Sequence, residues 1–263
     1  MEDIEDDLED IVMIKMLLVG CNGHMGHVIR NLVSDTEDVE IAAGVDAVSD
    51  GKEGFPVFTS MDACDVDSDV IVDFSIAPAV DGVLDYAVNH RVPLVECTTG
   101  LSQDQIARLN ECSQSVAILR SANMSLGVNT LLKLVKTATE ILGQAGFDID
   151  IVEKHHRRKL DAPSGTALAL ADAANEAAGG AYEYAFDRSE RRMKRPDNEI
   201  GISAVRGGTI VGQHDVIFAG TDEVVEFRHT AYSRAIFGKG AIAAARYLAD
   251  KPAGLYDMQD VIG

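Results

Sequence analysis

The sequence contains no tryptophan, few aromatic residues and far fewer bases than acids. Its 263 residues include 23 lysines and arginines against 43 aspartates and glutamates, which gives a formal net charge of −20 at pH 7. A protein that binds nucleic acid needs a basic face to neutralise phosphates, so this charge argues against nucleic acid as the main partner. No apolar run approaches the roughly 20 residues that a membrane-spanning helix requires, so we expect no membrane span.

Cysteine is also scarce, with four residues spread over the first half of the chain. They form no Cys-x-x-Cys pair and no zinc-ligand spacing, which predicts a reducing compartment and no metal site. Residues 1–12 hold seven acids and no base, so we interpret them as an acidic N-terminal extension rather than a secretory signal. We therefore expect a cytoplasmic enzyme. The cysteines are Cys21, Cys64, Cys97 and Cys112.

The first half of the chain alternates short apolar runs with helical patterns. Ser102 and Gln105 form a capping box that predicts a helix to about Cys112. Regular alternation of strand and helix implies right-handed βαβ units, and therefore an α/β fold with a Rossmann-type, doubly wound parallel sheet. The predicted strands are residues 15–20, 39–46, 70–74, 93–96 and 116–119.

The pattern changes after about Asn123, where a second, α+β domain on a mixed or antiparallel sheet is expected. Glycine turns at 207–208 and 220–222 predict antiparallel pairing of the last three β runs. We predict a dinucleotide-binding domain of residues 13–125 plus 235–263, interrupted by a second domain of residues 126–234. The elements expected there are helices at 128–142 and 166–178, β runs at 147–154, 200–205, 214–220 and 223–230, and an irregular polar stretch at 179–200.

Gly20, Gly23 and Gly26 directly follow the first predicted strand and precede a helix. Such a loop lets the backbone approach a pyrophosphate, which the free N–H groups of the helix start then bind. The alternative is a simple tight turn, but Asp46 ends the second strand, where a carboxylate binds the ribose hydroxyls of a dinucleotide. A carboxylate there repels a 2′-phosphate, which favours NADH over NADPH, although Lys52 lies near it in sequence.

Five cationic or proton-active residues stand in a row from His155 to Lys159, just before a helix start. Imidazole and lysine can both pass protons near neutral pH, so His155 and Lys159 are candidates for that role, and His156 is a candidate donor to an anionic substrate. A solvated charged loop is the alternative for the run taken alone, and we leave Arg157 and Arg158 to that interpretation.

The helix that follows this basic loop is expected to begin at Ser164, a good N-cap residue. Ser164, Gly165 and Thr166 would direct backbone N–H groups outward and form a site for a carboxylate or phosphate. This coupling of a cationic loop to an anion-binding helix start favours a substrate site over a surface loop.

The segment EKHHRRKLDAPSGTALALA resembles the signature of the 4-hydroxy-tetrahydrodipicolinate reductase (dihydrodipicolinate reductase) family. The resemblance extends over nearly the whole chain from Ile14, through VDFS, CTTG, ANMSLGVN, AVRGGTIVGQHDVIF and SRAIFGKGA. It implies NAD(P)H-dependent reduction of 4-hydroxy-tetrahydrodipicolinate to tetrahydrodipicolinate, with loss of water, in diaminopimelate and lysine biosynthesis. It also implies a homotetramer joined through residues 126–234, which would bind the substrate and mediate oligomerisation.

The same resemblance assigns roles to individual residues. His155 would donate or accept a proton, Lys159 would donate one, and a cyclic dicarboxylate would be held by His156, Ser164, Gly165, Thr166 and Arg234. Four residues depart from the usual family pattern and leave the choice between NADH and NADPH open: Asn22, Ala47, Cys97 and Met124. The cofactor-binding residues would be Gly20, Cys21, Asn22, Gly23, His24, Met25, Asp46, Cys97, Thr98, Thr99, Ser121, Ala122, Asn123 and Met124.

Three other functions share parts of this pattern. An acylating semialdehyde dehydrogenase needs a cysteine nucleophile, and no cysteine follows Cys112 to serve a second domain. A homoserine-type dehydrogenase is a further alternative. An NADH-binding redox sensor is a third, although it would not need His155 and Lys159 beside an anion-binding helix.

Overall fold

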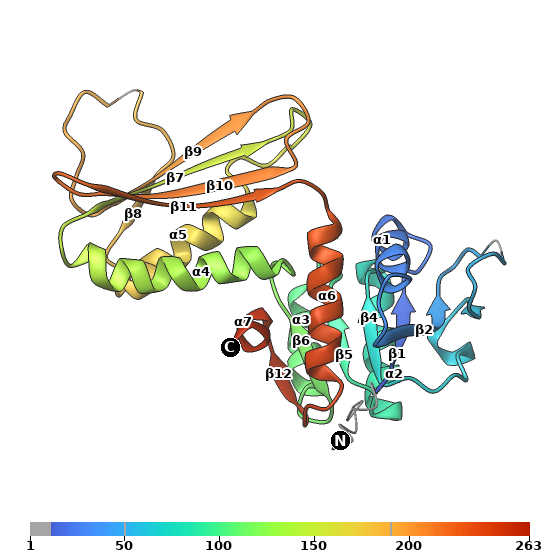
Figure 1. Cartoon of the computed structure of the whole chain (residues 1–263). Coiled ribbons are helices and arrows are strands. Elements are labelled where there is room, and N and C mark those ends of the chain that lie inside the picture. The colour runs from blue at the N-terminus through green and yellow to red at the C-terminus, as the bar shows by residue number, and fades with distance from the viewer. Residues whose placement is uncertain (1–11, 50, 190) are drawn as a thin grey trace, which may run out of the picture. The chain divides into compact units, whose positions relative to one another are not determined.

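The computed structural model describes residues 12–49, 51–189 and 191–263, so the predicted acidic extension lies outside the described residues except for Val12. The chain divides into two compact units. The first unit runs to Ala122 and resumes over Gly238–Val261, and the second consists of Asn123–Phe237 with the last two residues (Figure 1).

The first unit contains a seven-stranded parallel sheet in the order β12-β6-β5-β4-β1-β2-β3. The chain order reverses between β1 and β4, and open α/β sheets bind their ligands in the crevice beyond the carboxyl ends of such strands. The strands are β1 (Ile14–Val19), β2 (Val39–Val45), β3 (Val57–Phe58), β4 (Val70–Asp73), β5 (Leu94–Glu96), β6 (Ala117–Arg120) and β12 (Gly254–Tyr256).

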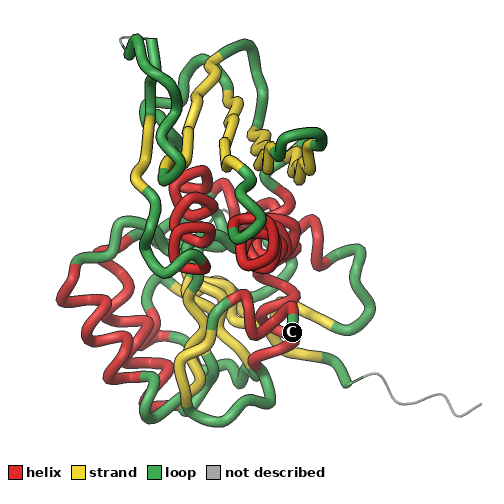
Figure 2. The backbone as a smooth tube through the Cα atoms, turned by 90° about the vertical axis from the view of Figure 1, so that its left-hand side faces the viewer, coloured by secondary structure: helices red, strands yellow, loops and turns green. Residues whose placement is uncertain are grey.

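Helices flank the strands of this sheet on both sides (Figure 2). The predicted capping box is confirmed, because Ser102 Oγ accepts from Gln105 N and the Gln105 side chain accepts from Ser102 N. The helices are α1 (His24–Val33), α2 (Val80–His90), α3 (Gln103–Cys112), α6 (Ala235–Leu248), which belongs to this unit from Gly238 onward, and α7 (Met258–Ile262). The predicted α/β fold with a doubly wound parallel sheet is therefore confirmed.

The second unit is built on a five-stranded mixed sheet in the order β11-β10-β7-β9-β8. Two helices, α4 (Leu126–Ala138) and α5 (Gly165–Ala177), lie on one face of it (Figure 1). Along β7, Ile149 and Ile151 point into the core between sheet and helices, and Glu153 and His155 follow on the same face. The strands are β7 (Asp148–His155), β8 (Glu183–Ala185), β9 (Glu199–Arg206), β10 (Gly212–Ala219) and β11 (Val224–Ala231).

Two details of the predicted second sheet are wrong. The expected antiparallel pairing across the turn at 207–208 does not form, because β7 lies between β9 and β10 and pairs in parallel with β9. β7 fills the place between them as a central strand, and the connection after β9 crosses its end, where Gly207 N donates to the His155 carbonyl. The stretch at 179–200 also contains β8, an edge strand of three residues that is too short to show a period. The turn at 220–222 joins antiparallel β10 and β11 as predicted.

No helix in the described part of the chain is both long enough and apolar enough to cross a membrane.

Candidate active site

A cavity of about 150 Å³ lies in the second unit, beside the ends of β7 and β11 and the starts of β10, α4 and α5. Four of the predicted catalytic and substrate-binding residues line it: His155, His156, Thr166 and Arg234. Asn123, which was expected to bind the cofactor, lies in the same wall and donates from Nδ2 to Thr166 Oγ1 at 3.2 Å. The structure thus brings together residues from five segments that are far apart in the sequence.

Glu153 organises the reactive end of this cavity. Its carboxylate is fully buried, and Oε2 lies 2.6 Å from His155 Nδ1. Arg206 donates to both carboxylate oxygens, at 2.6 and 2.7 Å, and the Ser164 backbone N–H donates to Oε1 at 3.0 Å. Burial alone would raise the pKa of Glu153, but the hydrogen bonds from Arg206, His155 and Ser164 outweigh it and lower the pKa, so this group is ionised.

An ionised Glu153 fixes the orientation of the His155 ring. The carboxylate can only accept, so His155 carries a hydrogen on Nδ1 and turns Nε2 toward the cavity side. Gly212 leaves the room for this arrangement, since a Cβ at that position would lie 3.1 Å from His155 Nε2. The result is an oriented imidazole whose free ring nitrogen can exchange a proton with a ligand.

The start of α5 forms the adjoining wall. Ser164 is its N-cap, as predicted, because Ser164 Oγ accepts from Ala167 N. The hydroxyl also lies 2.9 Å from His214 Nε2, so Ser164 is buried and connected to β10. Gly165 and Thr166 are the first residues of the helix, where backbone N–H groups have no partner within the helix.

Lys159 is not among the described residues that line the cavity. Its ammonium group instead lies 2.9 Å from Asp161 Oδ1, and this hydrogen bond lowers the pKa of Asp161. Arg157 and Arg158 are exposed, in agreement with a solvated part of the loop. The structure therefore separates the cationic run into inward-facing histidines and outward-facing arginines.

Four groups at this site were not predicted: Glu153, Arg206, His214 and His229. Glu153 stands two residues before His155, so alternation along a strand places both on one face, and this signal was available in the sequence. His214 lies within the segment AVRGGTIVGQHDVIF that carries the family resemblance, but no role was predicted for it, and His229 is a single histidine within a β run. Burial lowers the pKa of both, that of His214 to about 4 with a further contribution from His155.

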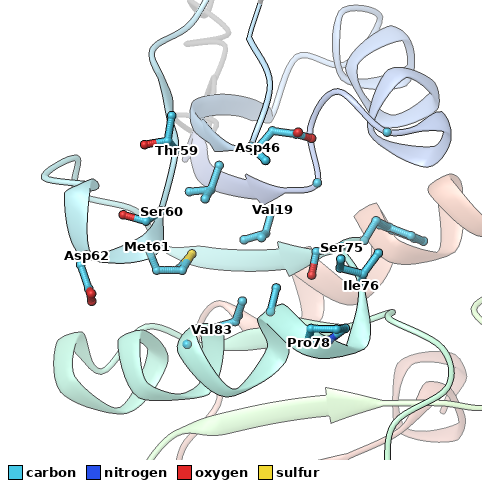
Figure 3. A pocket seen from close by; sticks show the side chains of 17 residues that line it. Val19, Asp46, Thr59, Ser60, Met61, Asp62, Ser75, Ile76, Pro78 and Val83 are labelled. Atoms are coloured by element: carbon cyan, nitrogen blue, oxygen red, sulfur yellow. The ribbon is translucent and has the colours of Figure 1, made fainter.

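A larger cavity, of about 550 Å³, lies in the first unit at the carboxyl ends of β1, β2 and β4 (Figure 3). Of the predicted cofactor-binding residues, Gly20, Gly23 and Asp46 line it. Asp46 Oδ2 accepts from Asn22 N at 3.0 Å, which ties the carboxylate to the glycine loop. Several lining residues were not predicted, and Figure 3 shows them around the opening: Thr59, Ser60, Met61, Asp62, Ser75, Ile76 and Pro78.

The glycine loop has the close backbone approach that a dinucleotide requires. Gly20 adopts a φ of +76°, and a Cβ there would lie 2.6 Å from the Phe74 carbonyl oxygen. A Cβ at Gly26 would lie 2.3 Å from the Gly20 carbonyl oxygen, so this helix turn can pass close to the loop only with glycine. Together with the start of α1 and Asp46, these residues fit a bound dinucleotide.

Other predicted cofactor residues do not line this cavity: Cys21, Asn22, His24, Met25, Cys97, Thr98 and Thr99. Cys21 is part of the core behind the loop, where burial and then the charge of Asp46 raise its pKa to about 11. The remaining four predicted cofactor residues also do not line this cavity. Ser121 and Ala122 are at the end of the first stretch of the first unit, and Asn123 and Met124 are the first residues of the second unit.

Two buried carboxyl groups, Asp73 and Glu96, face each other at the ends of β4 and β5. Asp73 Oδ1 accepts from Ser75 N and Glu96 Oε1 from Thr98 N, each at 2.7 Å. Their other oxygens are buried and lack a hydrogen-bond partner among the described residues; a proton kept by one carboxyl group and donated to the other would satisfy both, and the Ser75 and Thr98 hydroxyls lie close by. Burial, and then the charge of Asp73, raise the pKa of Glu96 to about 9, so the pair holds a proton at neutral pH.

Within the described residues, no three histidine, cysteine, aspartate or glutamate side chains gather closely enough to hold a metal ion.

Comparison with known proteins gives a consistent result over both units. The family model described as dihydrodipicolinate reductase, N-terminus, matches residues 14–124, and the one described as its C-terminus matches residues 127–262. The 4-hydroxy-tetrahydrodipicolinate reductase of Caldanaerobacter subterraneus subsp. tengcongensis is 46% identical over 251 residues, which cover 95% of this chain and 99% of the relative. Its counterpart from Clostridium tetani is 45% identical over 251 residues, with 95% and 98% covered.

Among solved structures, the dipicolinate-bound dihydrodipicolinate reductase from Paenisporosarcina sp. TG-14 superposes with a TM-score of 0.80 at 23% identity, covering 96% of this chain and 100% of that one. A myo-inositol dehydrogenase from Corynebacterium glutamicum gives a TM-score of 0.55 at 14% identity, with 95% and 93% covered. At these sequence identities, both similarities show that the fold is shared.

Proposed function

The chain belongs to the dihydrodipicolinate reductase family, and on that premise we propose that the cavity beside His155 is where it binds and reduces its substrate. The activity is that of the family: an NAD(P)H-dependent oxidoreductase that converts 4-hydroxy-tetrahydrodipicolinate to tetrahydrodipicolinate, with loss of water, in diaminopimelate and lysine biosynthesis. The observation that carries the assignment of the site is the buried Glu153–His155 pair at the wall of a cavity that also contains Arg234 and the start of α5.

The cavity suits a small dianion in a chain whose net charge is −20. Arg234 supplies a permanent positive charge, and His156 and Thr166 supply hydrogen bonds to the carboxylates. The first N–H groups of α5, at Gly165 and Thr166, add the positive end of the helix dipole. Ser164 acts from behind, by holding that helix start in place. Dipicolinate, the planar dicarboxylate bound to the Paenisporosarcina enzyme, is a suitable probe of this site.

Two side chains of the protein, His155 and Lys159, carry out the proton transfer. His155, oriented through Nδ1 by Glu153, presents Nε2 to the substrate and stabilises the charge that develops on the ring nitrogen. Lys159 supplies the compensating proton, which requires its ammonium group to exchange Asp161 for the substrate. A nicotinamide cofactor, when bound, supplies the hydride that adds at C4 after the 4-hydroxyl group has left.

Lys159→Ala is expected to lower kcat by about 100-fold, while the Kd for NADH changes by less than about twofold, because general acid catalysis contributes on this scale. Steady-state kinetics and a fluorescence titration with NADH measure the two quantities. Asp161→Asn serves as the matched control: it removes the ion pair but leaves the ammonium group, so most of the turnover should remain. Unchanged turnover in Lys159→Ala would remove Lys159 from the mechanism.

The cofactor is held by the glycine loop and Asp46, and NADH is preferred to NADPH. The support is the carboxylate of Asp46, which lines the first-unit cavity, and Glu53, which accepts from Asn22 Nδ2 at 2.9 Å on the same loop. Two carboxylates near the end of β2 oppose a 2′-phosphate.

A coupled assay tests the reaction and this preference together. With substrate generated from pyruvate and aspartate semialdehyde, we expect oxidation of NADH with a kcat/KM at least about fivefold above that of NADPH. Oxidation of neither cofactor would refute the reductase assignment. Equal rates would refute only the preference for NADH.

The proposal also includes a cytoplasmic homotetramer assembled through the second unit. All four cysteines are free thiols, as expected in a reducing compartment. The sheet face turned away from α4 and α5 exposes Val205 and Val224, and these positions lie on the surface that a sheet-to-sheet contact would cover.

A further inference from the structure

We propose that His214 is a further substrate-contacting residue of this enzyme, and that it donates a hydrogen bond from Nδ1 to a carboxylate oxygen of the bound dicarboxylate. The inference rests on the proposed substrate site and adds to it a residue for which the sequence predicted no role. His214 lines the cavity, although only 4% of the residue is exposed.

The sheet register places His214 at the centre of the reactive groups. On β10 it stands opposite Glu153 of β7 and opposite His229 of β11, so the three side chains form a row across the sheet on the face toward the helices. Its ring lies 5.2 Å from that of His155, edge to face at 72°. The His214 ring is therefore beside the imidazole that is proposed to exchange the proton.

Ser164 determines which nitrogen of His214 carries the hydrogen. Ser164 Oγ accepts from Ala167 N, and among the described residues His214 Nε2, at 2.9 Å, is in reach of the hydroxyl hydrogen, so we infer that the hydroxyl donates to this nitrogen. Since the ring is buried and accepts at Nε2, its hydrogen resides on Nδ1. Burial, with the nearby His155, lowers the pKa of His214 to about 4, so the ring is neutral at the pH of the cell.

The Nδ1–H of His214 has no acceptor among the described residues, and the atom is buried. A buried donor without a partner is unfavourable, and a ligand oxygen in the cavity relieves this cost. His156 and His229 also have a buried Nδ1 without a partner, but within the described part of the chain no hydrogen bond at Nε2 fixes their tautomers. We infer that His214 Nδ1–H is the donor that meets a carboxylate oxygen at this wall of the cavity, and it adds no charge next to His155.

Dipicolinate binding to the NADH-saturated enzyme tests the contact. His214→Phe keeps a ring beside His155 but removes the donor, and we expect the Kd for dipicolinate to rise about tenfold and the substrate KM to rise with it, while the NADH Kd changes by less than about twofold. His214→Gln, which retains an N–H donor, should recover part of the affinity. The matched control is His90→Phe, at the end of α2, where the histidine stacks on Tyr86 and a phenyl ring can do the same.

A two-bond ¹H–¹⁵N correlation spectrum of the wild-type enzyme provides a readout that a purely structural role would not change. We expect the Nδ1–H tautomer for His214, assigned by its loss in His214→Phe or His214→Gln, and a shift of the Nδ1 resonance on addition of dipicolinate. Any of three results would overturn the inference. These are the Nε2–H tautomer for His214, an Nδ1 resonance that does not shift on addition of dipicolinate, and a dipicolinate Kd in His214→Phe equal to that of the wild type. If the wild-type enzyme itself fails to bind dipicolinate, the proposed substrate site is wrong as well, so the two failures are distinct.

Discussion

Glu153→Gln is expected to lower kcat by about 100-fold or more, with little change in substrate KM or NADH affinity. Ser164 N and Arg206 Nη2 both donate to the Oε1 position, so the amide oxygen must remain there. The amide NH₂ then occupies the Oε2 position, where it loses the hydrogen bond from Arg206 Nη1 and donates to His155 Nδ1, which forces the ring hydrogen onto Nε2. A catalytic histidine in the wrong tautomer loses several orders of magnitude of turnover. Steady-state kinetics of the variant measures the effect.

A matched control is Glu140→Gln, an exposed glutamate just after α4 in the same unit, where activity should be unchanged. Gly212→Ala addresses the same imidazole from the other side: its Cβ, 3.1 Å from His155 Nε2, must displace the ring slightly while every hydrogen bond of Glu153 remains possible. Loss of turnover in both Glu153→Gln and Gly212→Ala, with cooperative thermal unfolding retained, identifies ring orientation as the cause. Full activity in Glu153→Gln would show that the carboxylate does not orient His155 for catalysis.

The sequence predicts those parts of this protein that depend on local pattern. The glycine loop, the capping box at Ser102, the N-cap at Ser164 and the alternation of strand and helix in the first unit all follow from residue type and spacing alone. The parts that could not be predicted depend on which strands become neighbours. Glu153, His214 and His229 form one row only because β7 enters between β9 and β10 and leaves β10 beside β11.

The carboxyl pair in the first unit could not be predicted either, because it too depends on which strands become neighbours. Asp73 and Glu96 lie 23 positions apart in sequence, and each looks like an ordinary strand-end acid until β4 and β5 pair in parallel and bring them face to face. For Lys159 the sequence predicts the position within the motif but not the partner. Its ion pair with Asp161 depends on the conformation of the loop. Residue spacing therefore predicts which functional groups lie in one local motif. Which groups from different strands are buried together depends on the sheet register.

The proton held between Asp73 and Glu96 predicts a pH-dependent stability. An unfolded glutamate has a pKa near 4.5, whereas that of Glu96 in the folded protein is about 9. Between these values only the folded state keeps the proton, so the stabilisation is complete below about pH 4.5 and is lost as the pH rises through about 9. Glu96→Gln is expected to remove this dependence, so its gain in free energy of unfolding over the wild type should grow by about 1.4 kcal/mol per pH unit, or about 3 kcal/mol from pH 6 to pH 8. Urea unfolding at pH 6 and pH 8 measures it, and exposed Glu111→Gln should follow the wild type.

The geometry of the pair makes this expectation specific, because the two amide substitutions should not add. In Glu96→Gln the amide oxygen accepts from Thr98 N and the NH₂ group donates to Asp73; in Asp73→Asn the oxygen accepts from Ser75 N and the NH₂ group donates to Glu96. Each single variant thus reproduces the protonated pair.

In the double variant both oxygens are held by the backbone and the two NH₂ groups meet, so it should be less stable than either single variant by about 2 kcal/mol. Additive gains in the double variant would instead mean that the carboxyl groups repel without sharing a proton. Since Ser75 lines the first-unit cavity, NADH affinity should fall along with stability in the double variant.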